Sequence, residues 1–411
     1  MARATTRNTP KPKATLAQTF RIDSVRASSA DFVQRNFRGH SRDHNLLLGL
    51  TLLLTAIGLV FVLSSSFVDA IQQNNNVFSI AGKQLLAALL GLVGLSWASS
   101  LRTQTIQMLA SWLSIGSIAV QLLVVLTPLG VSVNGNKNWI RIFGFTLQPS
   151  EFMKVAMILW IALLLQKHSH ELDDGMVWAK LGGITALAFF APVLLGKDVG
   201  TTIVMALVAV MMSVFAGLPR LFVYLIGAVG AVAVPAIMAS SPSRWGRVMA
   251  WLHPDAPDPN DYGWQSTHAI WAFAAGGIGG VGLGQSELKW SWIPEAENDF
   301  IFAIIGEEAG LIGAVVLILL FVALSALLIR IALRTPDPVN RMIVLGVMLW
   351  ISLQAFINIA VVLTWLPVLG VPLPLISSGG SSMISSLFAL GLVLAIEKQN
   401  GAPLRTSRSR R

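Results

Sequence analysis

The chain has 411 residues, of which 54% are hydrophobic and only 12% are charged, and its formal net charge is +9. Soluble domains carry about 25% charged residues, so this composition excludes an ordinary soluble globular protein. The sequence contains no cysteine, which excludes disulfides and thiolate metal sites.

Apolar residues are grouped in blocks of about 20, the length that a helix needs to cross roughly 30 Å of hydrocarbon. This pattern predicts an all-α polytopic membrane protein with about ten transmembrane helices. The predicted spans are residues 46–66, 80–99, 107–127, 150–166, 177–195, 201–218, 221–240, 301–330, 342–364 and 382–396.

The basic residues indicate which side of the membrane each connection faces. They gather in the first 45 residues, in short links between spans and in the C-terminal tail, and with ten spans all of these fall on one side. By the positive-inside rule, both termini are expected in the cytoplasm. This distribution argues against a nucleic-acid partner. The predicted parts are a disordered basic tail over residues 1–45, a transmembrane domain over 46–396 and a basic tail over 397–411.

The longest outward-facing connection covers residues 241–300 and precedes the eighth predicted span. It is the one strongly acidic stretch of the chain, and its aromatic residues are typical of a segment packed at the membrane interface. Within it, residues 265–275 predict a short amphipathic or re-entrant helix. Loops of this length in a compact fold are usually functional or disordered, so this loop is a candidate site.

Asp299 lies where the acidic loop meets the apolar stretch that begins at Phe300. Asp299 could cap that helix, because aspartate satisfies the free amides and the dipole at a helix N-terminus. It could also act as a general base, since a partly desolvated carboxylate is suited to accept a proton. The two interpretations are compatible, and both stay open.

Glu307 and Glu308 lie about two helical turns further into the same apolar stretch. Carboxylates at membrane depth are functional candidates by default. Adjacent helical residues point about 100° apart, so these two cannot share one face. We expect one to pair with a cation and the other to face a polar cavity; a proton or ion pathway is the alternative.

Two further charged pairs open predicted helices. Glu151 and Lys154 follow a helix-starting proline, and their i,i+3 spacing lets them pair on one face. They are either a structural ion pair or a lysine held ready for an anionic headgroup. Lys197 and Asp198 precede another span, where a helix N-terminus favours phosphate.

A serine- and glycine-rich turn, residues 377–382, precedes the last predicted span. Its backbone could form a nest for anionic oxygens, or it could be a simple polar break. The six histidines show no paired metal-ligand spacing, so no histidine metal site is predicted.

Several ordered motifs together resemble the SEDS family of bacterial cell-wall polymerases (shape, elongation, division and sporulation). The resemblance covers residues 44–397 and is greatest to the division branch, with the elongation branch as the alternative. The motifs are Asn134-Gly135 with Trp139-Ile140, Gln148-Pro149-Ser150-Glu151-Phe152, Asp198-Val199-Gly200-Thr201, Pro294-Glu295 with Asp299-Phe300-Ile301-Phe302-Ala303, Gly306-Glu307-Glu308, Gln354 and Asn358, and Leu373-Pro374 with Ile376-Ser377 and Gly379-Gly380-Ser381-Ser382.

The resemblance implies an inverting peptidoglycan glycosyltransferase of the bacterial cytoplasmic membrane. It would polymerise lipid II into glycan strands at the division septum, with Asp299 as the base on the acceptor sugar hydroxyl. Lys154, Lys197 and a divalent cation, Mg²⁺ or Mn²⁺, are the candidates for holding the diphosphate, and no organic cofactor is expected. The implied substrate-binding residues are Lys154, Glu151, Lys197, Asp198, Trp139, Gln265, Glu295, Ser377, Gly379, Gly380 and Ser381.

The same resemblance implies a class B penicillin-binding transpeptidase as partner, with other division proteins around it. Two other functions stay open at this point. One is a lipid flippase or transporter that uses Glu307, Glu308 and Lys154 as an ion-coupled path, and the other is a division scaffold without turnover.

The sequence also departs from the family pattern. Asn138 stands where the family usually has arginine, Gly196-Lys197 replaces Gln-Pro, His268 replaces glutamine, and Ser378 replaces an aromatic residue. Val368-Leu369-Gly370 replaces Thr-Lys-Gly. Two cations are therefore lost and one is gained at Lys197, so the contacts to phosphate are expected to differ from those of the family.

Overall fold

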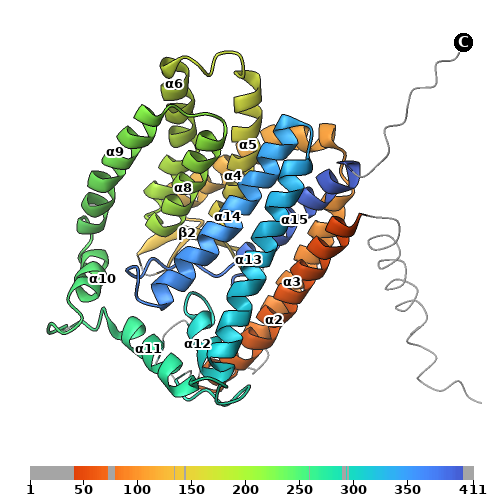
Figure 1. The fold of residues 1–411 in the computed structure, drawn as a ribbon. Helices are drawn as coiled ribbons and strands as arrows, with labels where there is room; N and C mark the ends of the chain where they lie inside the picture. The colour runs from red at the N-terminus through yellow and green to blue at the C-terminus, as the bar shows by residue number, and fades with distance from the viewer. Residues whose placement is uncertain are drawn as a thin grey trace, which may run out of the picture.

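The computed structural model describes residues 41–72, 79–133, 135–142, 145–258, 260–288, 293 and 296–400. Within this part, the protein is a bundle of long helices with one small sheet and a group of short helices at one end (Figure 1). The described helices are α2 (Arg42–Gln72), α3 (Ser79–Ser99), α4 (Thr103–Leu126), α5 (Pro149–Lys167), α6 (Gly175–Thr185), the π-helix η2 (Ala186–Phe190), α7 (Ala191–Leu195), α8 (Val199–Phe215), α9 (Arg220–Ala239), α10 (Pro242–Leu252), α11 (Trp264–Gly276), α12 (Ile301–Glu308), α13 (Gly310–Arg334), α14 (Pro338–Val362) and α15 (Gly380–Asn400).

The predicted polytopic membrane fold is confirmed. In the described residues, nine helical stretches are long and apolar enough to cross a membrane, with α6, η2 and α7 counted as one. The apolar helix α8, with 17 residues, is slightly shorter than these nine and matches the sixth predicted span. The beginning and the end of the described chain lie close together, because Ser41 Oγ, just before α2, donates to Glu397 Oε1, near the end of α15, at 2.7 Å.

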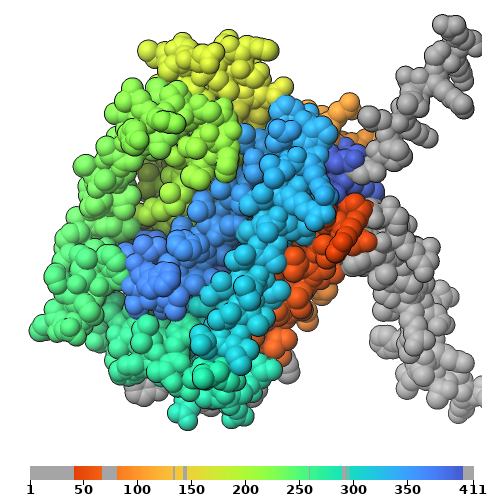
Figure 2. All heavy atoms as spheres, viewed as in Figure 1, coloured from red at the N-terminus to blue at the C-terminus, as the bar shows by residue number. Residues whose placement is uncertain are grey.

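The core of the bundle is formed by α5, α14 and α15, in which most residues are buried. Backbones approach closely where glycine removes a side chain: a Cβ at Gly58 of α2 would lie 2.5 Å from the carbonyl oxygen of Leu375. By contrast, α9 lies at the edge of the bundle, and Met238 is its one buried residue. Figure 2 shows an opening in the surface between α9 and α8.

The eighth span differs from the prediction. Residues 301–330 were expected to form one span, but α12 ends at Glu308 and α13 begins at Gly310. Gly310 has a φ of 67°, in the left-handed region that glycine enters at no steric cost. Glu307 and Glu308 therefore end a short helix inside the protein and do not continue into the span.

The connection 128–149 also differs, because it contains a three-stranded antiparallel sheet. The strands are β1 (Gly130–Val133), β2 (Asn136–Ile142) and β3 (Phe145–Leu147), in the order β1-β2-β3. Short hairpins are stable when one face packs on another element, and here α4 and α5 lie against β2. The sheet is the one exception to the all-α expectation among the described residues.

The long loop before the eighth span is largely ordered. The predicted helix over 265–275 is confirmed as α11, and a second helix, α10, was not anticipated. Trp251 at the end of α10 donates to the carbonyl oxygen of Thr364 at 2.8 Å, which ties the loop to the segment after α14.

Candidate active site

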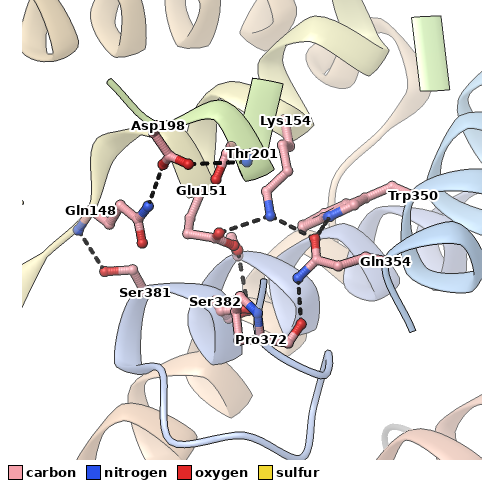
Figure 3. A network of polar contacts seen from close by, with 11 residues as sticks. Gln148, Glu151, Lys154, Asp198, Thr201, Trp350, Gln354, Pro372, Ser381 and Ser382 are labelled. Carbon is pink, nitrogen blue, oxygen red and sulfur yellow. Dashed lines mark hydrogen bonds and ion pairs between the residues drawn. The ribbon is translucent and has the colours of Figure 1, made fainter. Parts of the chain in front are cut away.

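The buried centre of the site is Lys154, on α5. Its ammonium donates to Glu151 Oε1 at 2.8 Å and to Gln354 Oε1 at 2.7 Å, and lies 4.9 Å from the ring centre of Trp350 (Figure 3). The predicted i,i+3 pairing is thus confirmed. Side chains of both partners are 2% exposed, and a buried charge is tolerated only when it is paired and hydrogen-bonded.

The start of α5 joins this centre to the start of α8. Gln148 Nε2 donates to Asp198 Oδ2 at 2.9 Å, and Asp198 Oδ1 accepts from the amide of Thr201 at 3.0 Å. Asp198 is therefore an N-cap of α8. Burial raises the pKa of its carboxyl, while hydrogen bonds from Thr201 lower it. The Gln148 amide also donates to Ser381 Oγ at 2.9 Å, which brings the start of α15 to the same place (Figure 3).

Two amides on one face of α14 connect this network to Asp299. Gln354 Nε2 donates to the carbonyl oxygen of Pro372 at 2.9 Å. One turn further, Asn358 Nδ2 donates to the carbonyl oxygens of Val371 at 2.8 Å and Asp299 at 2.7 Å. The segment that carries Val371 and Pro372 thus lies between the Lys154 network and Asp299.

Asp299 is fixed through its backbone, and its side chain is half-buried. A Cβ at Gly370 would lie 3.9 Å from Asp299 Oδ2, so the carboxylate lies close to this glycine. The N-cap residue of α12 is Phe300 and not Asp299 as expected, and the side chain of Phe300 makes no capping hydrogen bond. The helix begins one residue later than the sequence suggested, which leaves the Asp299 carboxylate outside its first turn.

Arg247, on α10, is the cation that acts electrostatically on Asp299. Burial lowers the pKa of its guanidinium, and the Asp299 carboxylate opposes that effect. Arginine nevertheless stays protonated in proteins. Arg247 Nε is buried and donates no hydrogen bond among the described residues. The charge of Arg247 therefore acts on the candidate base, while part of its donor capacity is unused.

Glu307 and Glu308 point to different partners, as their spacing requires. Glu307 accepts from Ser286 Oγ at 2.5 Å and from the Glu287 amide at 2.8 Å, whereas Glu308 accepts from Ser64 Oγ at 2.6 Å. Glu307 thus binds neutral donors of the loop that returns to α12. A cavity of about 700 Å³ borders Glu307, Gln285 and Trp271.

The other predicted residues have varied surroundings. Lys197 is exposed with a φ of 66°, beside buried Asp198. Ser377 is a turn residue whose Oγ accepts from the Leu373 amide at 2.8 Å, and the half-buried Gly379 and Gly380 lead into α15. The network of Figure 3 does not include Trp139, on β2, or Gln265, in the first turn of α11. Glu295 lies outside the described residues.

Sequence reasoning gave no site role to Gln354, Asn358, Trp350 or Arg247, which the structure brings to this site. The signal for Gln354 and Asn358 was present, since two amides occur four residues apart in an otherwise apolar span. Polar residues inside such spans usually face the protein interior. Nothing in the sequence pattern singles out Arg247 from the other basic residues of its loop.

In the described part of the chain, no group of three or more His, Asp or Glu side chains could hold a metal ion. Mg²⁺ is often held by one or two carboxylates together with substrate phosphates and waters. A substrate diphosphate would supply the phosphate oxygens of that second arrangement. A divalent cation here would share its ligands between protein and substrate.

Known proteins resemble this chain over most of its length. The family model described as cell cycle protein, of FtsW, RodA and SpoVE, matches residues 44–402. The probable peptidoglycan glycosyltransferase FtsW of Mycobacterium tuberculosis is 39% identical over 354 residues, 85% of this chain and 66% of that protein. This chain thus spans slightly less than two thirds of that relative. Stage V sporulation protein E of Bacillus subtilis is 36% identical over 86% of this chain and 96% of that protein.

Solved structures share the fold. One chain, from a structure described as "Structural coordination of polymerization and crosslinking by a peptidoglycan synthase complex", has a TM-score of 0.74 and 26% identity, covering 89% of this chain and 100% of that one. The rod shape determining protein RodA of Thermus thermophilus has a TM-score of 0.64 and 24% identity, covering 90% of this chain and 100% of that one.

Proposed function

The chain belongs to the family of FtsW, RodA and SpoVE cell cycle proteins, and from that premise we propose that it is a peptidoglycan glycosyltransferase. It polymerises lipid II into glycan strands. The division branch is favoured over the elongation branch, because the relatives at 34–39% identity include several named FtsW. The same names speak against a flippase.

The observation that carries the proposal is the placement of Asp299. Its backbone is held by Asn358 at 2.7 Å, while its half-buried carboxylate faces Gly370 and the charge of Arg247. A fixed backbone with a partly exposed carboxylate is what a general base requires.

The reaction follows from this arrangement. Asp299 takes the proton of the acceptor sugar hydroxyl as that oxygen attacks the anomeric carbon of the donor. The bond from this carbon to the diphosphate breaks on the opposite face, so the configuration inverts, and the lipid diphosphate leaves. The negative charge that develops on the leaving group needs cations close by.

Lys197 is the better placed of the two predicted lysines for that diphosphate. It is exposed beside Asp198, whereas Lys154 is buried and already donates to Glu151 and Gln354. Lys154 then serves to position α5, α14 and the segment around Pro372. A divalent cation, when bound, would neutralise diphosphate charge in the same place.

The protein acts in the bacterial cytoplasmic membrane with both termini in the cytoplasm and is enriched at the division site. Its partner is a class B penicillin-binding transpeptidase, with other division proteins around the pair. This assignment is supported by the similarity to a chain of a peptidoglycan synthase complex.

The test is polymerisation of labelled lipid II by the purified protein with its transpeptidase partner. Asp299→Asn removes the base and keeps the size of the side chain, and we expect a loss of at least about 100-fold. Asp261→Asn is the matched control, because it removes an exposed carboxylate of the same loop. Wild-type rates for Asp299→Asn would show that Asp299 is not the base. Lipid transport without polymer, lost in Glu307→Gln, would support the flippase instead.

A further inference from the structure

Lys197 is held in a backbone conformation that lysine rarely adopts. Its φ is 66°, in the left-handed region that is unfavourable for a residue with a Cβ. Such a conformation persists only where the surrounding structure fixes it, and it occurs most often at functional sites. The Lys197 amide donates to the carbonyl oxygen of Leu194 at 2.8 Å, and the Asp198 amide donates to that of Val193 at 3.3 Å. These bonds close the turn between α7 and α8, and the Lys197 side chain is exposed.

Strand β2 fixes this turn from outside. The Gly196 carbonyl oxygen accepts from the Lys137 amide at 2.9 Å and from Asn138 Nδ2 at 3.1 Å. Asn138 is fully buried, and its Oδ1 accepts from Gln121 Nε2 of α4 at 2.8 Å. Both ends of the Asn138 amide are therefore used, one toward α4 and the other toward the turn. A buried side chain 58 positions earlier in the chain thus holds the residue before Lys197.

The contact between Asn138 and the turn depends on glycine at position 196. A Cβ at Gly196 would overlap Asn138 Oδ1. Asn138, Gly196 and Lys197 are also three of the positions at which the sequence departs from the family pattern. A proline at position 197 could neither adopt a positive φ nor donate the amide hydrogen bond. The three departures therefore form one unit, in which glycine admits the asparagine side chain and asparagine fixes the turn that carries the lysine.

The turn lies close to the candidate base. Lys197 precedes Gly200 by three residues, which span at most about 11 Å. A Cβ at Gly200 would lie 2.5 Å from the carbonyl oxygen of Leu369, so the first turn of α8 packs against the segment after α14. The next residue of that segment, Gly370, is the glycine close to Asp299 Oδ2. One short stretch of backbone therefore separates the start of α8 from the candidate base.

We propose that Asn138 is a positioning residue, which fixes the turn at Gly196 so that the Lys197 ammonium is available to the diphosphate of the lipid-linked donor. The inference rests on the proposed function, because it adds to that function the group that holds its diphosphate-binding lysine. The hydrogen bonds from β2 stabilise the turn against the unfavourable φ of Lys197. A cation held in advance stabilises the charge that develops on the leaving group without having to be ordered during the reaction.

The experiment measures KM and kcat for lipid II with the full chain and its transpeptidase partner. The dissociation constant of a polyprenyl diphosphate, measured by native mass spectrometry in phosphatidylcholine nanodiscs, supplies a readout without turnover. Lys197→Gln removes a charge-assisted contact, so KM and the dissociation constant should rise about tenfold. Asn138→Ala should raise both about fivefold and change kcat less, whereas a loss of folded enzyme would lower kcat and leave KM unchanged. Asn136→Ala, at a half-buried position of the same strand, is the matched control and should behave as wild type.

Three further variants separate the lysine side chain from the turn. Gly196→Ala displaces the Asn138 side chain and should raise KM as Asn138→Ala does. The double variant Asn138→Ala with Lys197→Gln should bind no more weakly than Lys197→Gln alone, because residues that act through one group are not additive. Lys197→Gly accepts the left-handed φ at no steric cost. It should therefore unfold at or above the wild-type temperature and still show the higher KM.

A wild-type KM and dissociation constant in Asn138→Ala or in Lys197→Gly would overturn the proposal. Effects that multiply in the double variant would overturn it too, because Asn138 would then act independently of Lys197. Either result leaves the polymerase assignment intact as long as Asp299→Asn abolishes polymer. Weaker binding of the polyprenyl diphosphate in Asn138→Ala, with Asp299→Asn fully active, would keep the positioning role and remove the assigned base.

Discussion

Glu151 and Asp299 are two carboxylates near the same segment, residues 370–372, but their surroundings differ. Glu151 is 1% exposed and its charge is matched by Lys154 at 2.8 Å. Asp299 is half-buried, and it is its carbonyl oxygen, not its carboxylate, that Asn358 holds at 2.7 Å. The buried Glu151 carboxylate pairs with Lys154 and stabilises the fold, whereas the Asp299 carboxylate is partly exposed and can exchange a proton with a ligand.

The largest effect is predicted for the buried pair of Glu151 and Lys154. Lys154→Met removes the cation and leaves Glu151 charged in a dry site, so we expect a loss of about 3–5 kcal/mol of stability. The measurement is thermal unfolding of purified protein in detergent. The double variant Glu151→Gln with Lys154→Met should recover part of the loss, because it removes both charges. Equal stability of single and double variants would mean that the pair does not hold the bundle.

The second prediction concerns Asn358, which links Asp299 to the segment that carries Val371. Asn358→Leu leaves the carbonyl oxygens of Asp299 and Val371 without their donor, which should cost about 2–3 kcal/mol and free the backbone of Asp299. Gln354→Leu, one turn away on α14, should cost a similar amount of stability. Polymerisation by folded protein should fall further in Asn358→Leu. Equal activity in the two variants would argue that holding Asp299 by its backbone is unimportant.

A smaller effect is expected at the loop that returns to α12. Glu307→Gln keeps an acceptor for the Glu287 amide but removes the charge that strengthens its hydrogen bonds, a loss of about 1 kcal/mol. Limited proteolysis at residues 285–288 measures it, and cleavage should be faster than in wild type. Glu287→Gln changes an exposed neighbour and should leave the rate unchanged; faster cleavage there as well would point to net charge as the cause.

The sequence predicted the spans well, because a stretch of about 20 apolar residues has few alternatives in a membrane. It also predicted that Glu151 pairs with Lys154, since i,i+3 spacing is a local property. The break at Gly310 was missed because Ala309 and Gly310 lead directly into an unbroken apolar run, and only the φ of 67° reveals the turn. The sheet was missed because its strands have three to seven residues.

Contacts between distant segments were beyond local patterns. The bonds from Asn358 to Asp299 and from Gln354 to Pro372 join residues 59 and 18 positions apart. Hydropathy shows that such amides face the interior but not which carbonyl they reach. The same holds for Arg247, whose charge acts on Asp299 and whose helix, α10, is tied to the segment after α14 by the bond from Trp251 to the Thr364 carbonyl oxygen.

The smallest effect is expected at Arg247, whose charge acts on Asp299. Arg247→Gln removes the positive charge that acts on Asp299 while keeping a polar side chain at a half-buried position. A nearby cation favours the ionised carboxylate, so its loss should move the acid limb of the pH–activity profile to higher pH. At neutral pH we expect about a threefold lower rate, or ~0.65 kcal/mol. Arg244→Gln, three residues away, is the control, since Arg244 donates to the Ile237 carbonyl oxygen at 3.3 Å. An acid limb that stays in place in Arg247→Gln would show that this arginine does not act on the base.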